Sequence, residues 1–97
     1  MARIKYFELG AQPITVRYVK KIKGTSDFGY FLPANNLIYI RTHDGKKRIH
    51  EMQILLTLLH EVAHAIGFAL NRRELLNDDI FVDNIAQMFL QFLKTRK

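Results

Sequence analysis

The pattern of apolar and polar positions divides this chain into a β-rich first part and an α-rich second part. Residues 14–22 (ITVRYVKKI) alternate in steps of two, which is typical of a strand with one buried face. Two shorter aromatic and β-branched segments, 28–32 and 37–41, flank the turn-forming sequence PANN at 33–36. We expect them to form a hairpin. Residues 3–9 fit either an additional edge strand or a short helix.

The second part predicts two helices, separated from the strands by a loop over 42–48 that contains an Asp-Gly turn signal. The first helix runs from about Ile49 to Leu70 and is apolar nearly all round, which is typical of a central, buried helix. The second covers about Asp79 to Leu93 and follows the capping sequence Asn77-Asp78.

These elements predict an α+β fold in a single domain over 1–97. We expect a small N-terminal antiparallel sheet of about three strands, packed on the long helix and on the C-terminal helix. With 97 residues, of which 48% are hydrophobic, the chain can bury one modest core.

Composition narrows the possible classes of protein. The chain contains no cysteine, which excludes disulfides, thiol catalysis and a cysteine-based zinc site. It has no uninterrupted run of roughly 18 uncharged apolar residues, and its start lacks the apolar stretch of a signal peptide. We therefore expect a cytoplasmic protein with no membrane partner.

The net charge of +6 raises the question of nucleic-acid binding. Basic residues cluster at 20–23, 46–48, 72–73 and 94–97. Solvated turns and chain ends explain these clusters better, because they do not share one helix face and no aromatic residues are interleaved with them. A helix-turn-helix is disfavoured because the long helix is too apolar to lie in a DNA groove. Nucleic acid remains a possible but less favoured partner.

The most informative motif is His60-Glu61-Val62-Ala63-His64, in the middle of the long helix. A four-residue step turns an α-helix by about 400°, so both imidazoles project from one face and can hold a single zinc ion. Glu61 lies about 100° round the helix, close enough to reach a water molecule that the ion activates. Gln53 and Thr57 share the histidine stripe, either as partners that orient the imidazoles or as solvated polar positions.

A catalytic zinc ion usually has a third protein ligand. No histidine follows the motif, and His50 lies about 15 Å before it along the helix, too far to contribute. We favour Asp83 of the last helix, with Asp79 second and the loop residue His43 not excluded. Both aspartates also suit the first turns of a helix, whose dipole they oppose. Gly67, on the histidine stripe, would let another segment approach closely.

The motif predicts hydrolysis of a peptide bond, with Glu61 as the general base that takes a proton from water and returns it to the leaving amine. Tyr30, Tyr39 and His43 are candidates for stabilising the oxyanion. The strand over 37–41 is a candidate edge to which an extended peptide substrate adds as a further strand.

With these residues in view, the stretch 29–92 resembles the small HExxH zinc metallopeptidases of the ImmA/IrrE type and minimal gluzincin-like domains. In that family the helix after the motif carries Glu, then Ala three residues on and an aromatic residue three further; Asp83, Ala86 and Phe89 occupy those places here. The resemblance implies a zincin fold and zinc as cofactor. It also assigns the site residues: zinc would be bound by His60, His64 and Asp83, with Glu61 as catalytic base.

Aspartate in place of glutamate departs from the family pattern and keeps Asp79 in consideration. The third histidine of metzincins is absent, because Leu70 occupies that position. Family members often come from phages and bacteria, where relatives cleave repressors or regulators, so the resemblance implies a protein or peptide substrate.

We therefore expect a cytoplasmic zinc metallopeptidase, with Glu61 as its general base and a regulatory role among the possibilities. The alternative is a non-catalytic basic protein- or DNA-binding module with a structural or vestigial zinc site. A third interpretation is an accessory subunit that needs a partner domain to complete its cleft. The sequence leaves the oligomeric state open.

Overall fold

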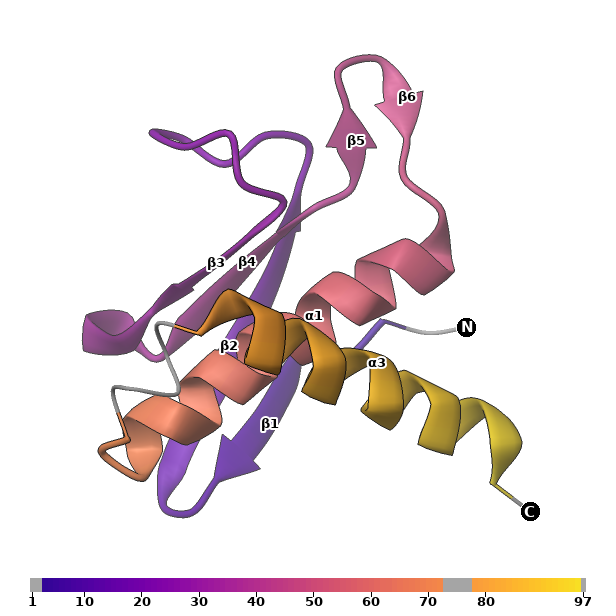
Figure 1. Ribbon diagram of the computed structural model, residues 1–97. Coiled ribbons are helices and arrows are strands. Elements are labelled where there is room, and N and C mark those ends of the chain that lie inside the picture. Colours follow the sequence, from indigo (N-terminus) through magenta and orange to yellow (C-terminus); the bar gives the residue numbers. More distant parts are fainter. Residues whose placement is uncertain (1–2, 73–77, 97) are drawn as a thin grey trace.

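The computed structural model describes residues 3–72 and 78–96. Its central element is the helix α1 (Glu51–Ala69), which lies between a β-sheet on one side and the helix α3 (Asp79–Thr95) on the other (Figure 1). The α+β class is thus confirmed. The strands are β1 (Tyr6–Leu9), β2 (Gln12–Val19), β3 (Gly29–Leu32), β4 (Leu37–Arg41), β5 (His43–Asp44) and β6 (Lys47–Arg48), with a 3₁₀ turn at Pro33–Asn35.

The four long strands form one sheet in the order β1-β2-β4-β3. The β3–β4 hairpin forms as predicted, and residues 6–9 of the ambiguous first segment form the edge strand β1. The expectation of an entirely antiparallel sheet of about three strands was wrong, because β2 and β4 pair in parallel. After β2, the chain leaves the neighbouring position empty and forms β3 at the far edge of the sheet. β4 then fills the position between β2 and β3 and runs parallel to β2.

The segment over 42–48, predicted as a loop, forms a second small sheet. His43 pairs with Arg48 and Asp44 with Lys47. Gly45 has φ 64°, a conformation that glycine adopts readily and that suits the tight turn between the strands.

Side chains that alternate along the strands build the core on one face of the sheet. Ile14 and Val16 of β2 and Ile38 and Ile40 of β4 are at most 3% exposed and cluster with the α1 residues Ile54 and Leu58. The residues between them, such as Arg17 and Tyr39, point to the other face because successive strand side chains alternate. Among the described residues, both helices lie on the core side of the sheet (Figure 1).

The helix ends agree closely with the sequence. His50 caps α1, with its Nδ1 accepting a hydrogen bond from the Met52 N–H. Asp78 caps α3 by accepting from the Phe81 N–H, as predicted, whereas Asn77 lies outside the described residues. Gly67, where a close approach was expected, is buried.

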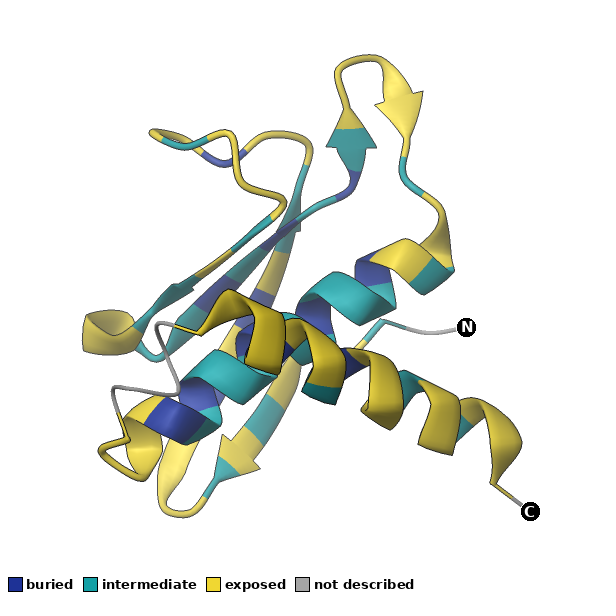
Figure 2. Ribbon diagram, viewed as in Figure 1, coloured by how far each residue is buried: buried dark blue, intermediate teal, exposed yellow. Residues whose placement is uncertain are grey.

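By length and composition, α1 qualifies as a helix that could cross a membrane. The core helix of a soluble protein meets the same test, and α1 packs against the sheet and against α3. Figure 2 shows buried residues along α1, where it faces the sheet. The compact, globular arrangement suggests a soluble protein.

Candidate metal centre

The helical spacing brings the two motif histidines together as predicted. Their Nε2 atoms lie 3.0 Å apart, and their ring centroids are separated by 4.7 Å. Both side chains are partly buried, at 21% exposure for His60 and 17% for His64. The face of α1 that carries them is turned toward the first two turns of α3.

The first turns of α3 supply two carboxylates, which contact different atoms of the histidines. Asp83 Oδ1 lies 2.6 Å from His60 Nδ1, the ring nitrogen that faces away from the other imidazole. Asp79 Oδ1 lies 3.8 Å from His64 Nε2, on the side where the two Nε2 atoms meet. One ligand atom each from His60, His64 and Asp79 falls within 4.8 Å of the others.

With both imidazoles neutral, these contacts define one pair of tautomers. A carboxylate can only accept, so His60 donates its Nδ1–H to Asp83 and leaves Nε2 with a free lone pair. His64 Nε2 then donates to His60 Nε2 across the 3.0 Å contact. A metal ion would replace that single proton between the two nitrogens.

The arrangement of donors suits zinc. Two ligands about 2.05 Å from an ion in tetrahedral geometry lie about 3.3 Å apart, and the two Nε2 atoms are separated by 3.0 Å. Imidazole nitrogens with one carboxylate oxygen are a common catalytic zinc set. A carboxylate on the far nitrogen of a ligating histidine is a frequent supporting contact in such sites.

Glu61, the predicted base, is only 8% exposed. Burial raises the pKa of its carboxyl from 4.5 to about 7, an effect opposed by the nearby His60 and reinforced by Asp27 and Asp79. This pKa suits a group that must both accept and donate a proton near neutral pH.

The strand β3 crosses Glu61 very closely. A Cβ added at Gly29 would lie 2.9 Å from Glu61 Cγ and 2.8 Å from Thr57 Cγ2. Only glycine allows this approach, which holds the Glu61 side chain in place beneath the strand.

The pKa of His64 is shifted in the opposite direction from that of Glu61. Burial lowers the pKa of its imidazole, as does the neighbouring His60, while Asp79 and Asp83 raise it. The neutral imidazole is the form that binds a metal ion, so burial favours the state that a ligand needs.

A cleft of about 580 Å³ opens above these groups. The β3 side contributes residues 27–31, α1 contributes the polar stripe from Gln53 to His64 with Glu61 beside it, and α3 contributes Asp79 and Asp83. The strand along the cleft is therefore β3, at the edge of the sheet. The prediction that residues 37–41 form the edge was wrong, because β4 lies between β2 and β3.

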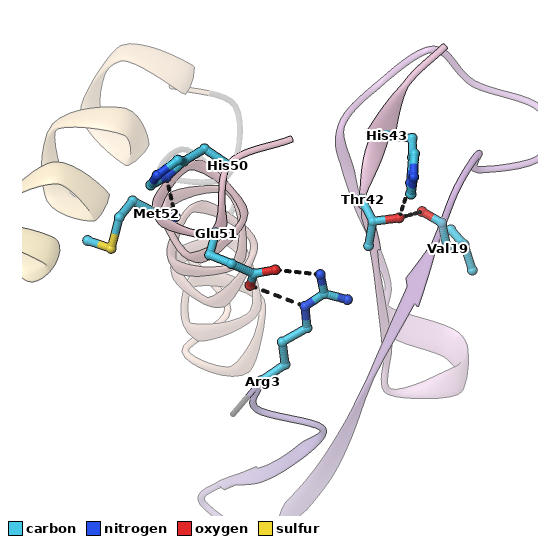
Figure 3. Close-up of polar contacts among 7 residues, drawn as sticks. All are labelled: Arg3, Val19, Thr42, His43, His50, Glu51 and Met52. Carbon is cyan, nitrogen blue, oxygen red and sulfur yellow. Dashed lines mark hydrogen bonds and ion pairs between the residues drawn. The ribbon is translucent and has the colours of Figure 1, made fainter. Parts of the chain in front are cut away.

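The other residues considered from the sequence lie at different distances from the cleft. Tyr30 and Tyr39 are direct cross-strand partners, so both side chains lie on the face of the sheet opposite α1, although Tyr30 also borders the cleft. His43 lies in β5, outside the cleft, with its Nδ1 2.7 Å from Thr42 Oγ1, and His50 is the α1 cap (Figure 3). Thr57 donates to the Gln53 backbone oxygen at 3.0 Å, within its own helix.

Sequence reasoning missed the contribution of Asp27 and of Gly29 to the cleft. The glycine at the start of an aromatic strand was the available signal, since an isolated glycine in a strand often marks a close approach by another segment. Comparison of the chain with protein-family models, with curated proteins and with solved structures found no match.

Proposed function

We propose that this protein is a zinc-dependent metallopeptidase that acts in the cytoplasm of a bacterial or phage-infected cell. The observation that carries the proposal is the meeting of His60, His64 and Asp79 at the base of a cleft beside the buried Glu61. These are the components that hydrolysis of a peptide bond by activated water requires.

The contacts favour distinct roles for the two aspartates. Asp79 is the third zinc ligand, because its carboxylate lies on the side where the two Nε2 atoms meet. Asp83 holds His60 in orientation through Nδ1. This assignment reverses the order of preference that the sequence suggested.

Zinc bound there supplies a Lewis acid that makes water acidic and polarises a carbonyl group. The Glu61 carboxylate accepts the proton of the attacking water and donates it to the leaving amine.

The substrate is an extended peptide. Among the described strands, β3 pairs along one side only, with β4, and consecutive residues from Asp27 to Phe31 line the cleft. A peptide added as a strand to the free side of β3 would satisfy backbone hydrogen bonds and run along the cleft.

The test combines metal analysis with cleavage of quenched fluorogenic peptides of mixed sequence. We expect one zinc ion per chain in the wild type and in Glu61→Gln, with cleavage lost only in the latter, by roughly 10³-fold or more. His64→Ala should lose both. Absence of bound zinc after reconstitution, or undiminished cleavage by Glu61→Gln, would refute the enzyme.

A second candidate function is supported by the outer face of the sheet. Tyr30, Tyr39 and Arg17 are direct partners across three strands, so they form one row on the side that no described helix covers. Lys21 and Lys23 join both tyrosines around a pocket of about 430 Å³. The fold thus gathers the aromatic and basic groups that were dispersed in the sequence, the combination that binds single-stranded nucleic acid.

Fluorescence anisotropy with labelled single-stranded DNA and RNA tests this second function. We expect Tyr30→Ala and Tyr39→Ala each to weaken binding by about 10-fold, and binding to fall with salt. Glu61→Gln serves as the matched control that leaves this face intact. Micromolar binding that ignores both tyrosine substitutions would exclude the row as a stacking surface.

A further inference from the structure

The helix α3 carries more apolar surface than α1 covers. Its buried residues, Val82 and Ala86, face α1. Next to them, on an arc about 100° wide, a second set of large apolar side chains faces solvent. We call this set the α3 stripe; its members are the exposed Phe81, Met88, Phe89 and Phe92 and the half-buried Ile85.

The exposure of the α3 stripe is high for residues of this size. Met88 is 70% exposed, Phe92 63% and Phe89 49%. Figure 2 shows α3 as the helix with the most exposed surface, in contrast to α1. With about 200 Å² per large side chain, the stripe leaves roughly 500 Å² of apolar surface in one patch, which approaches the share of one partner in a standard interface.

Charges of opposite sign bracket the stripe. Asp78 is the N-cap of α3 and Arg96 is its C-cap, 18 residues or five helical turns later. Each uses part of its side chain locally: Asp78 Oδ1 accepts from the Phe81 N–H, and Arg96 Nη1 donates to the Leu93 backbone oxygen. Both residues are exposed at the two ends of the helix.

We propose that the α3 stripe is a homodimer interface, in which two copies of α3 pair antiparallel about a two-fold axis near residue 87. This axis sets Asp78 of each copy opposite Arg96 of the other, which gives two such pairs in the dimer. It also sets Ile85 opposite Phe89 of the second copy, so that apolar residues meet apolar residues along the stripe. A surface whose ends are complementary to each other is suited to such isologous pairing.

The same charges argue against a lipid surface as the partner. Helices that lie on membranes carry cationic residues along their polar face. The polar face of α3 carries three uncharged amides, Asn84, Gln87 and Gln91, and one lysine, Lys94, while three aspartates lie at its cap and in its first two turns. The pairing also lies on a different side of α3 from Asp79 and Asp83, so it leaves the cleft open.

The first experiment measures mass in solution by light scattering, from about 1 µM to about 1 mM protein, a range that spans tight to weak pairing. We expect twice the 11.4 kDa chain mass for the wild type. Met88→Glu and Phe92→Glu should shift the dissociation constant upward by at least 10-fold. Gln87→Glu and Gln91→Glu, on the polar face of the same helix, are the matched controls and should remain dimeric.

The second experiment tests the antiparallel register. The native chain has no cysteine, so single-cysteine variants react with a short thiol crosslinker at one position only. Met88→Cys lies next to the proposed axis and should give covalent dimers. Phe81→Cys should not, because the axis separates the two copies of residue 81 by about 18 Å along the helices.

Three results would overturn the proposal. A wild type that stays monomeric at the highest concentration would show that the stripe is not self-complementary. Dimers that persist in both glutamate variants would place the interface elsewhere, and crosslinking of Phe81→Cys would show a parallel pair. A monomer that binds lipid vesicles through the stripe would identify a membrane as the partner instead.

Discussion

At the scale of single residues, the two aspartates of α3 differ in which histidine nitrogen they approach. Asp83 lies against His60 Nδ1, whereas Asp79 lies near His64 Nε2. Replacing a carboxylate by an amide removes the negative charge that a metal ligand contributes. The same replacement preserves a hydrogen bond from an N–H donor, because an amide oxygen also accepts.

We therefore expect Asp79→Asn to weaken zinc binding much more than Asp83→Asn does. Asp83→Ala, which removes the acceptor, should lower zinc affinity by about 10–100-fold, the usual effect of losing a group that orients a ligating histidine. Competition with a fluorescent chelator measures all three. If Asp83→Asn proves the most damaging, the ligand assigned from sequence was correct.

Glu61 gives a pH-dependent effect on stability in the protein freed of metal by a chelator. Its pKa is raised from 4.5 to about 7, so the folded state keeps a proton that the unfolded chain has already released. The free energy of unfolding therefore falls as pH rises from about 4.5 to about 7, and the penalty is complete above that range.

Glu61→Gln removes this ionisation with little change of shape. We expect the metal-free variant to be more stable than the wild type at pH 8, by at most about 3.5 kcal/mol, at about 1.4 kcal/mol for each unit of the rise. Below about pH 4.5 the two denaturation curves should coincide. An equal difference at pH 4 and pH 8 would mean that burial of the charge is not the cause.

The sequence located three of the site residues but not their relation to α3. Helical spacing alone sets the geometry of His60, Glu61 and His64, because all three belong to one helix. Asp79 and Asp83 are also four apart on one helix, so periodicity gives them equal access. The way α3 crosses α1 distinguishes them, and that crossing depends on the packing of many side chains at once.

At the scale of elements, the contact between β3 and α1 depends on Gly29. The Cβ of an alanine there would meet Thr57 Cγ2 at 2.8 Å and Glu61 Cγ at 2.9 Å. We expect Gly29→Ala to destabilise the fold by about 1–3 kcal/mol, as overpacking does, and to reduce catalysis by displacing Glu61.

The second substitution Thr57→Ser should restore part of that stability, because serine lacks Cγ2 and keeps the hydroxyl that donates to the Gln53 backbone oxygen. The measurement is a double-mutant cycle by chemical denaturation. Strictly additive effects would show that the alanine is accommodated without contact with Thr57.

The strands and helices also show which features of the fold the pattern of apolar and polar residues can predict. The alternation of Ile38 and Ile40 and the stripe of α1 follow from local periods, so the strands and helices were predicted within a few residues. Strand order was not, because β4 reads equally well as an edge or as an interior strand. Its place between β2 and β3 depends on the long connection over residues 20–28, which has no local signal.

At the scale of the whole molecule, the proposed zinc site and the α3 stripe lie on different sides of one helix. Among the described elements, α3 packs mainly against α1, through the apolar contacts around Val82 and Ala86 and through the contacts of Asp79 and Asp83. Anything that fixes α3 in place therefore also fixes the carboxylates for the metal.

This arrangement couples the two proposals. If zinc binding and dimerisation each favour the docked position of α3, each must strengthen the other, because coupling free energies are reciprocal. We expect the monomeric variant Met88→Glu to bind zinc more weakly than the control Gln87→Glu, by roughly 5-fold or more, although neither residue contacts the site. Removal of zinc from the wild type should raise its dimer dissociation constant by the square of that factor, because each dimer holds two zinc ions. Sedimentation with and without a chelator measures this change. Zinc affinity that ignores Met88→Glu would mean that α3 is already fully docked in the metal-free monomer.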